Sequence, residues 1–168
     1  MKAIVLVGFM GCGKTAVGRL LAERLEVPFV DLDDELERLE GKPIGRIFAE
    51  DGEAYFRRRE REVLRSLAGG DLVLAVGGGA FTVDDNIAVI NTNSVSVWLD
   101  CPLAICLARA ARSPARRPLF SDAEEMAVLF RHRLRFYKRA HHRVDSGSGE
   151  PKEVAEAIFR ELGLEAEA

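Results

Sequence analysis

The sequence has few cysteines, no long apolar run and no excess of basic charge. Its 168 residues hold three cysteines, an odd number without metal-ligand spacing, which argues against a disulfide framework and favours reduced thiols. No apolar stretch approaches the ~20 residues that a membrane helix needs. The chain enters an apolar run within its first residues, so we expect no signal peptide. These absences predict a cytoplasmic protein that does not partner a membrane.

A glycine-rich motif follows that first apolar run, Ala3 to Val7. Residues 8–15 read Gly-Phe-Met-Gly-Cys-Gly-Lys-Thr, which fits G-x-x-x-x-G-K-[ST], and apolar residues at helical spacing come next. The glycines let backbone N–H groups converge on phosphate oxygens, and a helix N-terminus adds partial positive charge. Lys14 suits the β- and γ-phosphates of a nucleoside triphosphate, and the Thr15 hydroxyl suits Mg²⁺. The alternative is a tight turn with an exposed lysine. The nucleotide-binding residues expected here are Gly11, Cys12, Gly13, Lys14, Thr15 and Ala16.

The net charge of −3 does not favour general nucleic-acid binding, but the charge is uneven along the chain. Basic residues greatly outnumber acidic ones between Ala104 and Arg143. A solvated basic surface is one interpretation. Cations gathered around bound phosphates are the other, and the phosphate-binding motif in the same chain favours it.

The length and a 48% hydrophobic content predict one domain over residues 1–168. We expect strands near residues 3–7, 27–31, 72–76, 95–99 and 143–145, with the second strand buried. Helices are expected after the glycine-rich motif and near residues 33–40, 44–50, 53–67, 102–111, 122–139 and 151–162. We assign no element to residues 80–94 and a mobile loop to residues 112–122. Strands that alternate with helices predict a parallel sheet covered on both faces.

Ligands of such sheets bind beyond the carboxyl ends of the strands, and several polar residues fall there. Asp31 and Asp33 close the second strand. A carboxylate there can orient Mg²⁺ or accept the proton of an attacking hydroxyl, although Asp also caps helices, so the pattern assigns a chemical role to one of the two without choosing. Asp100, at the end of the fourth strand, is expected to cap a helix or turn.

Two arginines and a triple glycine complete this group. Arg57 lies at the edge of an apolar helical face, and a local ion pair with Glu60 is the simpler explanation for it. Arg133 falls inside an apolar stripe, and a cation at such a position usually binds an anion. Gly77, Gly78 and Gly79 permit close approach of a ligand to the backbone, or a sharp strand exit. Together they suit a small polyhydroxylated acid.

These motifs resemble the shikimate kinase family over nearly the whole chain. The resemblance rests on Asp31-Leu32-Asp33, Ile47-Phe48 with Gly52-Glu53, Phe56-Arg57-Arg58-Arg59-Glu60, Gly77-Gly78-Gly79, Arg117-Pro118-Leu119, and Arg133 through Tyr137. It implies a three-layer α/β P-loop fold, with a five-stranded parallel sheet in the order 2-3-1-4-5 and helices on both faces. It also implies a mobile lid at about 112–122 and a substrate-binding helical region at about 33–61.

The activity that the resemblance implies is transfer of the ATP γ-phosphoryl group to the 3-hydroxyl of shikimate, in the biosynthesis of chorismate and aromatic amino acids. Lys14, Asp33 and Arg117 would be catalytic. Asp33, Arg57, Gly77, Gly78, Gly79 and Arg133 would bind shikimate. Arg109 and Arg117 would contact ATP, and Thr15 and Asp31 would bind one Mg²⁺ in a monomer. Cys12 and Phe120 depart from the usual residues, and residues 146–150 lack an arginine that some members place near adenine.

Three alternatives stay open at this point. A gluconate-type kinase shares the phosphate loop, a nucleoside-monophosphate kinase would need a second base pocket, and a nucleotide-binding regulator would lack catalysis. The paired arginines and triple glycine argue against the first. We find no second base pocket for the next, and Asp33 with Arg117 weighs against the last.

Overall fold

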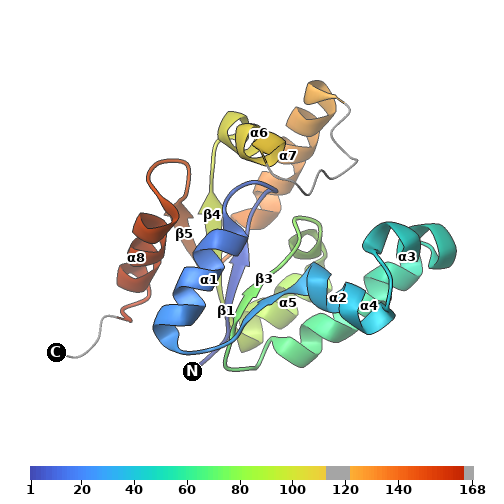
Figure 1. The fold of residues 1–168 in the computed structure, drawn as a ribbon, viewed down its shortest axis with the longest axis horizontal. Coiled ribbons are helices and arrows are strands. Elements are labelled where there is room, and N and C mark those ends of the chain that lie inside the picture. Colours follow the sequence, from blue (N-terminus) through green and yellow to red (C-terminus); the bar gives the residue numbers. More distant parts are fainter. Residues whose placement is uncertain (113–121, 165–168) are drawn as a thin grey trace.

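A computed structural model describes residues 1–112 and 122–164, and a parallel sheet forms their centre (Figure 1). The strands have the order β2-β3-β1-β4-β5, as expected from the sequence. Their bounds are β1 Ile4–Val7, β2 Phe29–Asp31, β3 Val73–Ala75, β4 Val95–Asp100 and β5 His142–Asp145. Strand β1 pairs with β3 and β4 on its two sides, and its four residues are buried, which explains its unbroken apolar sequence.

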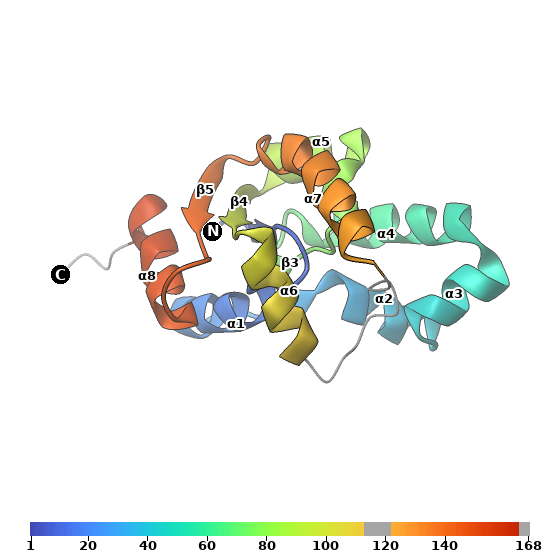
Figure 2. The same cartoon turned by 90° about the horizontal axis from the view of Figure 1, so that it is seen from above.

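Helices cover both faces of this sheet. Helix α1 (Lys14–Leu25) packs against α8 (Pro151–Glu161) on one face, and α5 (Asp84–Asn93) and α7 (Ala123–Tyr137) lie on the other (Figure 2). Helices α2 (Leu32–Glu40), α3 (Ile44–Asp51) and α4 (Glu53–Leu67) extend to one side of the sheet, and α6 (Leu103–Arg112) follows β4 (Figure 1). No helix in the two described ranges is both long and apolar enough to cross a bilayer.

Two expectations about these elements were wrong. Residues 80–94, left without an element, form a short 3₁₀ turn at Ala80–Thr82 and then α5. The helix carries Asn and Thr among its apolar residues, so its apolar face is short and gives a weak periodic signal. Strand β2 is half-buried rather than buried, because it lies at the edge of the sheet and pairs only with β3.

The parallel strands bring distant polar residues to one edge of the sheet. The phosphate loop follows β1, Asp31 ends β2, and the triple glycine follows β3. Because parallel strands end at the same edge, these three segments surround one region of space.

Candidate active site

The glycine-rich segment forms a compact loop between β1 and α1. Gly13 has a φ of 105° and directly precedes the first residue of α1, Lys14. Gly11 has a φ of 79°, and a Cβ on it would overlap the carbonyl oxygen of Cys106 in α6. The loop therefore rests directly on the backbone of α6. The Lys14 ammonium group donates to the carbonyl oxygens of Gly8 at 2.6 Å and Phe9 at 3.1 Å.

A cavity of about 650 Å³ lies beyond the carboxyl ends of the strands. It is lined by residues of the phosphate loop and by all the residues expected to hold an acceptor. Those expected from the sequence are Gly11, Gly13, Lys14, Thr15, Ala16, Asp31, Asp33, Arg57, Gly77, Gly78, Gly79, Arg109 and Arg133. Both sets of residues thus line one space, as a transfer between two bound molecules requires.

Asp31 and Asp33 have different environments. Asp31 is the N-cap of α2, and its Oδ1 accepts hydrogen bonds from the backbone N–H groups of Asp33 at 2.9 Å and Asp34 at 3.2 Å. Asp33 lies in the first turn of α2 with its carboxylate next to Gly77, where a Cβ would come within 3.2 Å of Oδ2. The capping role belongs to Asp31, so Asp33 is the carboxylate of the pair that does not cap the helix.

Arg57 and Glu60 form the ion pair that the sequence suggested. The Arg57 Nη1 donates to Glu60 Oε1 at 2.9 Å, and both residues line the cavity. Glu60 is buried while Arg57 keeps contact with solvent. Burial raises the pKa of Glu60 above its ordinary value, and this effect outweighs the opposing influence of the Arg57 charge.

Arg133 lies against the triple glycine and the ring of Phe9. Its guanidinium carbon lies 5.6 Å from the centre of the Phe9 ring, within range of a cation–π interaction. A Cβ on Gly78 would meet this guanidinium, which would have to move from its present position. The Tyr137 hydroxyl donates to the Gly78 carbonyl at 3.2 Å. Burial raises the pKa of this hydroxyl, which therefore stays protonated and able to donate.

Arg109 reaches the phosphate loop from α6. Its Nη1 lies 3.4 Å from the Cys12 carbonyl oxygen and 3.7 Å from the Cys101 sulfur. The side chains of Cys12, Cys101 and Cys106 are all buried. Cys12 thus fills space beneath the loop, with its sulfur 3.7 Å from the Lys14 nitrogen. Burial raises the pKa of the Cys101 and Cys106 thiols.

Two further expectations have other outcomes. Asp100 was expected to cap a helix or turn, but its carboxylate accepts hydrogen bonds from the Arg143 guanidinium of β5, one of them at 2.8 Å from Nε. Sequence spacing alone does not distinguish a carboxylate that caps a helix from one that pairs with a cation on the neighbouring strand. Residues 113–121 lie outside the described residues. They include Arg117, Phe120 and the expected lid at about 112–122 apart from its flanking residues Arg112 and Asp122.

The residues present fit a magnesium ion that is held mainly by phosphates. No group of three or more His, Cys, Asp or Glu side chains within residues 1–112 and 122–164 could hold a metal by itself. Mg²⁺ commonly takes one or two protein ligands and completes its shell with phosphate oxygens and water. Thr15 and Asp31 line the same cavity as Lys14 and can supply such ligands.

The sequence did not assign two residues of α3, Ile44 and Phe48, to this cavity, although Phe48 belongs to a motif of the resemblance. Phe48 packs on Phe56 of α4 with ring centres 4.6 Å apart. The four-residue spacing of Ile44 and Phe48 on an amphipathic helix is the signal that could have found them. Tyr137 was read only as part of the apolar stripe and of a motif, because sequence spacing does not show which backbone carbonyl its hydroxyl meets.

Comparison with known proteins now identifies the family. A family model described as shikimate kinase matches residues 10–163. The chain belongs to the shikimate kinase family. A shikimate kinase of Cereibacter sphaeroides is 44% identical over 165 residues, covering 96% of this chain and 82% of that protein. A shikimate kinase of Persephonella marina is 39% identical over 95% of this chain and 98% of its own length.

A solved structure of the family has the same fold. The structure of shikimate kinase from Acinetobacter baumannii in complex with shikimate matches with a TM-score of 0.89 and 36% identity, covering 100% of this chain and 96% of that chain. The strand order and fold class expected from the sequence are therefore confirmed, and so is the resemblance to shikimate kinases.

Proposed function

We propose that this chain transfers the γ-phosphoryl group of ATP to the 3-hydroxyl of shikimate, giving shikimate 3-phosphate and ADP. The single observation that carries the proposal is the shared cavity, in which the phosphate loop faces a carboxylate, two arginines and the triple glycine. The membership of this chain in the shikimate kinase family supports the choice of acceptor.

The acceptor is held by its carboxylate in this proposal. Arg57 and Arg133 approach the cavity from α4 and α7, and both carry fork-shaped guanidinium groups suited to a carboxylate. Glu60 keeps the Arg57 side chain in a fixed direction through its hydrogen bond. Gly77, Gly78 and Gly79 leave room for the ring of the acceptor to approach the backbone.

The reaction needs a positioned hydroxyl and cations around the transferred group. Asp33 accepts the hydrogen bond of the attacking hydroxyl and takes its proton as the bond to phosphorus forms. Lys14 leaves the Gly8 and Phe9 carbonyls and neutralises charge on the β- and γ-phosphates. Backbone N–H groups from Gly11 to Ala16 hold the phosphates, Arg109 lies by the adenine, and Arg117 supplies a further cation.

Mg²⁺, held by Thr15 and Asp31 together with the phosphates, neutralises the phosphate charge when it is bound. We further propose that residues 1–168 act as a single catalytic unit, that the enzyme is a monomer, and that it works in the cytoplasm. The absence of a helix able to cross a membrane in the described residues is consistent with this location.

The test is ADP release by the purified chain with ATP, Mg²⁺ and shikimate, compared with gluconate and with no acceptor. We expect ADP release that depends on shikimate, with the product identified as the 3-phosphate by ³¹P NMR. A methyl ester of shikimate, which lacks the charged carboxylate, should be a much poorer acceptor. Equal rates with shikimate and without an acceptor would overturn the proposal. Faster turnover of gluconate would show that gluconate, and not shikimate, is the acceptor.

A further inference from the structure

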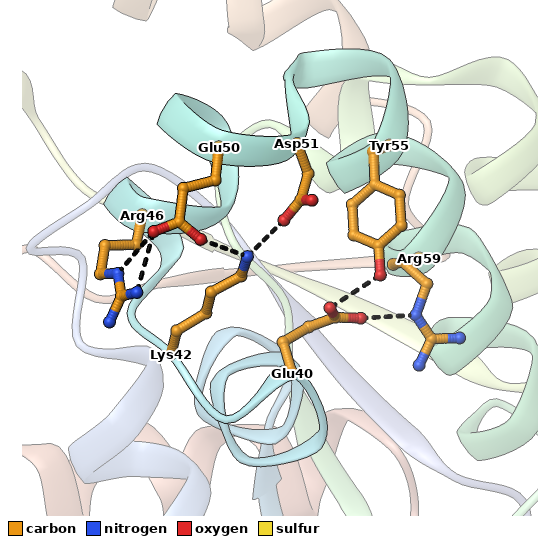
Figure 3. A network of polar contacts seen from close by, with 7 residues as sticks. All are labelled: Glu40, Lys42, Arg46, Glu50, Asp51, Tyr55 and Arg59. Carbon is orange, nitrogen blue, oxygen red and sulfur yellow. Dashed lines mark hydrogen bonds and ion pairs between the residues drawn. The ribbon is translucent and has the colours of Figure 1, made fainter.

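Two neighbouring groups of polar contacts lie among the three helices that extend from the sheet (Figure 3). The first is centred on Glu40, the last residue of α2. Its Oε2 accepts a hydrogen bond from the Tyr55 hydroxyl at 2.8 Å, and its Oε1 accepts one from the Arg59 Nε at 2.7 Å. The Glu40 side chain is only 10% exposed. Both carboxylate oxygens are therefore used, and both bonds cross from α2 to α4.

These two bonds hold one side of α4 against the end of α2. Tyr55 and Arg59 are four residues apart and project from one side of α4, where Figure 3 shows both directed at Glu40. Arg57 and Glu60 project from the same two turns into the cavity. Because a helix turns as a rigid body, holding Tyr55 and Arg59 also holds the direction of Arg57.

The second group of polar contacts involves α3 (Figure 3). The Lys42 ammonium group, in the turn between α2 and α3, donates to Glu50 at 2.8 Å and to Asp51 at 2.5 Å. Glu50 also accepts from the Arg46 Nε at 2.9 Å. The Lys42 contacts tie the last turn of α3 to the segment between α2 and α3. Helix α3 in turn presents Ile44 and Phe48 to the cavity.

Glu40 differs from the ordinary surface ion pairs of this protein. In the Arg24–Glu156 pair between α1 and α8, both side chains are more than two-fifths exposed, and such pairs contribute little. The side chains of Glu40 and Lys42 are far less exposed. The hydrogen bonds from Arg59 and Tyr55 also lower the pKa of Glu40, so its carboxylate stays ionised at neutral pH.

We propose that Glu40 is a positioning residue for phosphoryl transfer. It joins the end of α2 to α4, so that Asp33 at the start of α2 and Arg57 on α4 keep a fixed separation across the acceptor. Glu40 does not line the cavity and acts through Tyr55 and Arg59. The proposal rests on the proposed function, because it names shikimate as the acceptor that is positioned.

The test compares Glu40→Gln and Tyr55→Phe with the matched control Glu156→Gln, which makes the same change in an exposed pair. Small displacements of binding groups reduce catalysis steeply, so we expect Glu40→Gln to raise the KM for shikimate about tenfold and to leave the KM for ATP within about twofold. Tyr55→Phe, which removes one hydroxyl, should have a smaller effect of the same kind. Glu156→Gln should leave both constants unchanged.

Two further measurements separate positioning from general weakening. Hydrogen–deuterium exchange in Glu40→Gln should rise at the end of α2 and in the first turns of α4 and stay unchanged in α1 and α8. Combining Glu40→Gln with Tyr55→Phe should cost less than the sum of the single changes, because both remove one interaction. Equal increases in the two KM values, or a shikimate KM equal to that of Glu156→Gln, would overturn the proposal.

The proposed function can fail separately from this inference. If the unchanged enzyme does not phosphorylate shikimate, the acceptor is wrong. The exchange measurement then decides alone whether Glu40 holds α2 and α4 together. If the unchanged enzyme is active and Glu40→Gln retains its shikimate KM and its exchange pattern, only the positioning role is wrong.

Discussion

Arg57 and Glu60 form an ion pair in which the anion is buried and the cation is not. Their atoms Nη1 and Oε1 lie 2.9 Å apart, with the Glu60 side chain 2% exposed and the Arg57 side chain 37% exposed. The buried carboxylate therefore loses most of its hydration, while the guanidinium keeps part of its surface free for an incoming anion. The pKa of Glu60 is raised as a result of this burial.

Glu60→Gln is expected to stabilise the protein and weaken shikimate binding. A raised pKa means that the folded state holds the proton more tightly than the unfolded chain, so ionised Glu60 lowers the free energy of unfolding above that pKa. Gln removes this cost. The gain in Tm should be largest above the raised pKa and disappear as the pH falls below the ordinary value for Glu. Arg57 loses its charged partner, so the KM for shikimate should rise about tenfold.

Thermal melts between about pH 8 and about pH 4, with initial rates at neutral pH, check this prediction, since that range extends below the ordinary Glu pKa of about 4.3. Glu62→Gln, a change of an exposed glutamate on the same helix, is the control. A difference in Tm between Glu60→Gln and the unchanged protein that does not vary with pH would contradict it.

Asp33→Asn should reduce kcat. The change keeps the size of the side chain and removes the negative acceptor, and help from a general base is typically worth about 10²–10⁴-fold. If the proton leaves late, the loss reflects the position of the hydroxyl rather than its basicity. Steady-state kinetics with Asp85→Asn as a control distinguish the site from a general charge effect. Unchanged kcat and unchanged shikimate KM together would remove Asp33 from the reaction.

Lys14→Ala should greatly lower kcat with the fold intact. Its ammonium group donates to two carbonyls of its own loop, and we expect it to exchange these for phosphate oxygens. Loss of a cation at the transferred group can cost on the order of 10³ in rate. Circular dichroism verifies the fold, and Lys152→Ala on α8 serves as the control. A near-normal kcat for Lys14→Ala would show that other cations suffice.

Arg133→Lys should raise the KM for shikimate and leave ATP affinity nearly unchanged. An ammonium group cannot form two parallel hydrogen bonds to a carboxylate, and loss of a charge-assisted bond costs roughly 1.5–3 kcal/mol, or about tenfold to a hundredfold in affinity. Arg133→Leu should bind shikimate worse still. It should also melt at a higher temperature without ligands, because it completes the apolar stripe of α7.

Calorimetric titrations with shikimate and with an unreactive ATP analogue check this pair of variants. Arg135→Lys, an exposed arginine two residues away, is the control and should behave like the unchanged protein. Normal shikimate binding by Arg133→Leu would place the carboxylate site elsewhere.

Cys12 should react with alkylating reagents before the other two thiols, and ATP or ADP should slow its reaction. Its sulfur lies 3.7 Å from the Lys14 ammonium, whereas burial raises the pKa of the Cys101 and Cys106 thiols. All three are buried, so native labelling should be slow compared with labelling in denaturant. Mass spectrometry of partly labelled protein gives the order. Equal labelling, or no protection by nucleotide, would contradict the prediction.

The sequence predicted the parts of the fold that have strong local signals. The four helices before β3 agree with the structure, because they carry apolar periodicity, a capping residue or a recognisable motif. The order of the strands, which the family resemblance implied, also agrees. Helix α5 was missed because its apolar face is short and it follows a glycine run without a clear start. Asp100 was expected to be a cap because the sequence does not show that the Arg143 side chain reaches it from the adjacent strand β5.

The sequence likewise predicted some features of the candidate site and not others. Residue type and spacing placed Lys14, Asp33 and Arg133 correctly in one cavity. The choice between Asp31 and Asp33 as the helix cap depended on hydrogen-bond directions that spacing does not contain. The bonds of Glu40 with Tyr55 and Arg59 join residues that are 15 and 19 positions apart, and no local pattern predicts such pairs.

The continuity of helices α2 to α4 in the sequence affects how acceptor preference can change. They form one continuous stretch of chain between the neighbouring strands β2 and β3, and they interact with one another through their own polar contacts. Exchanging this stretch alters one side of the cavity in a single genetic event, while the phosphate loop and its contacts with α6 keep their sequence. The donor half and much of the acceptor half can therefore evolve, or be redesigned, at separate rates, provided that the exchanged helices bring their own equivalent of Glu40.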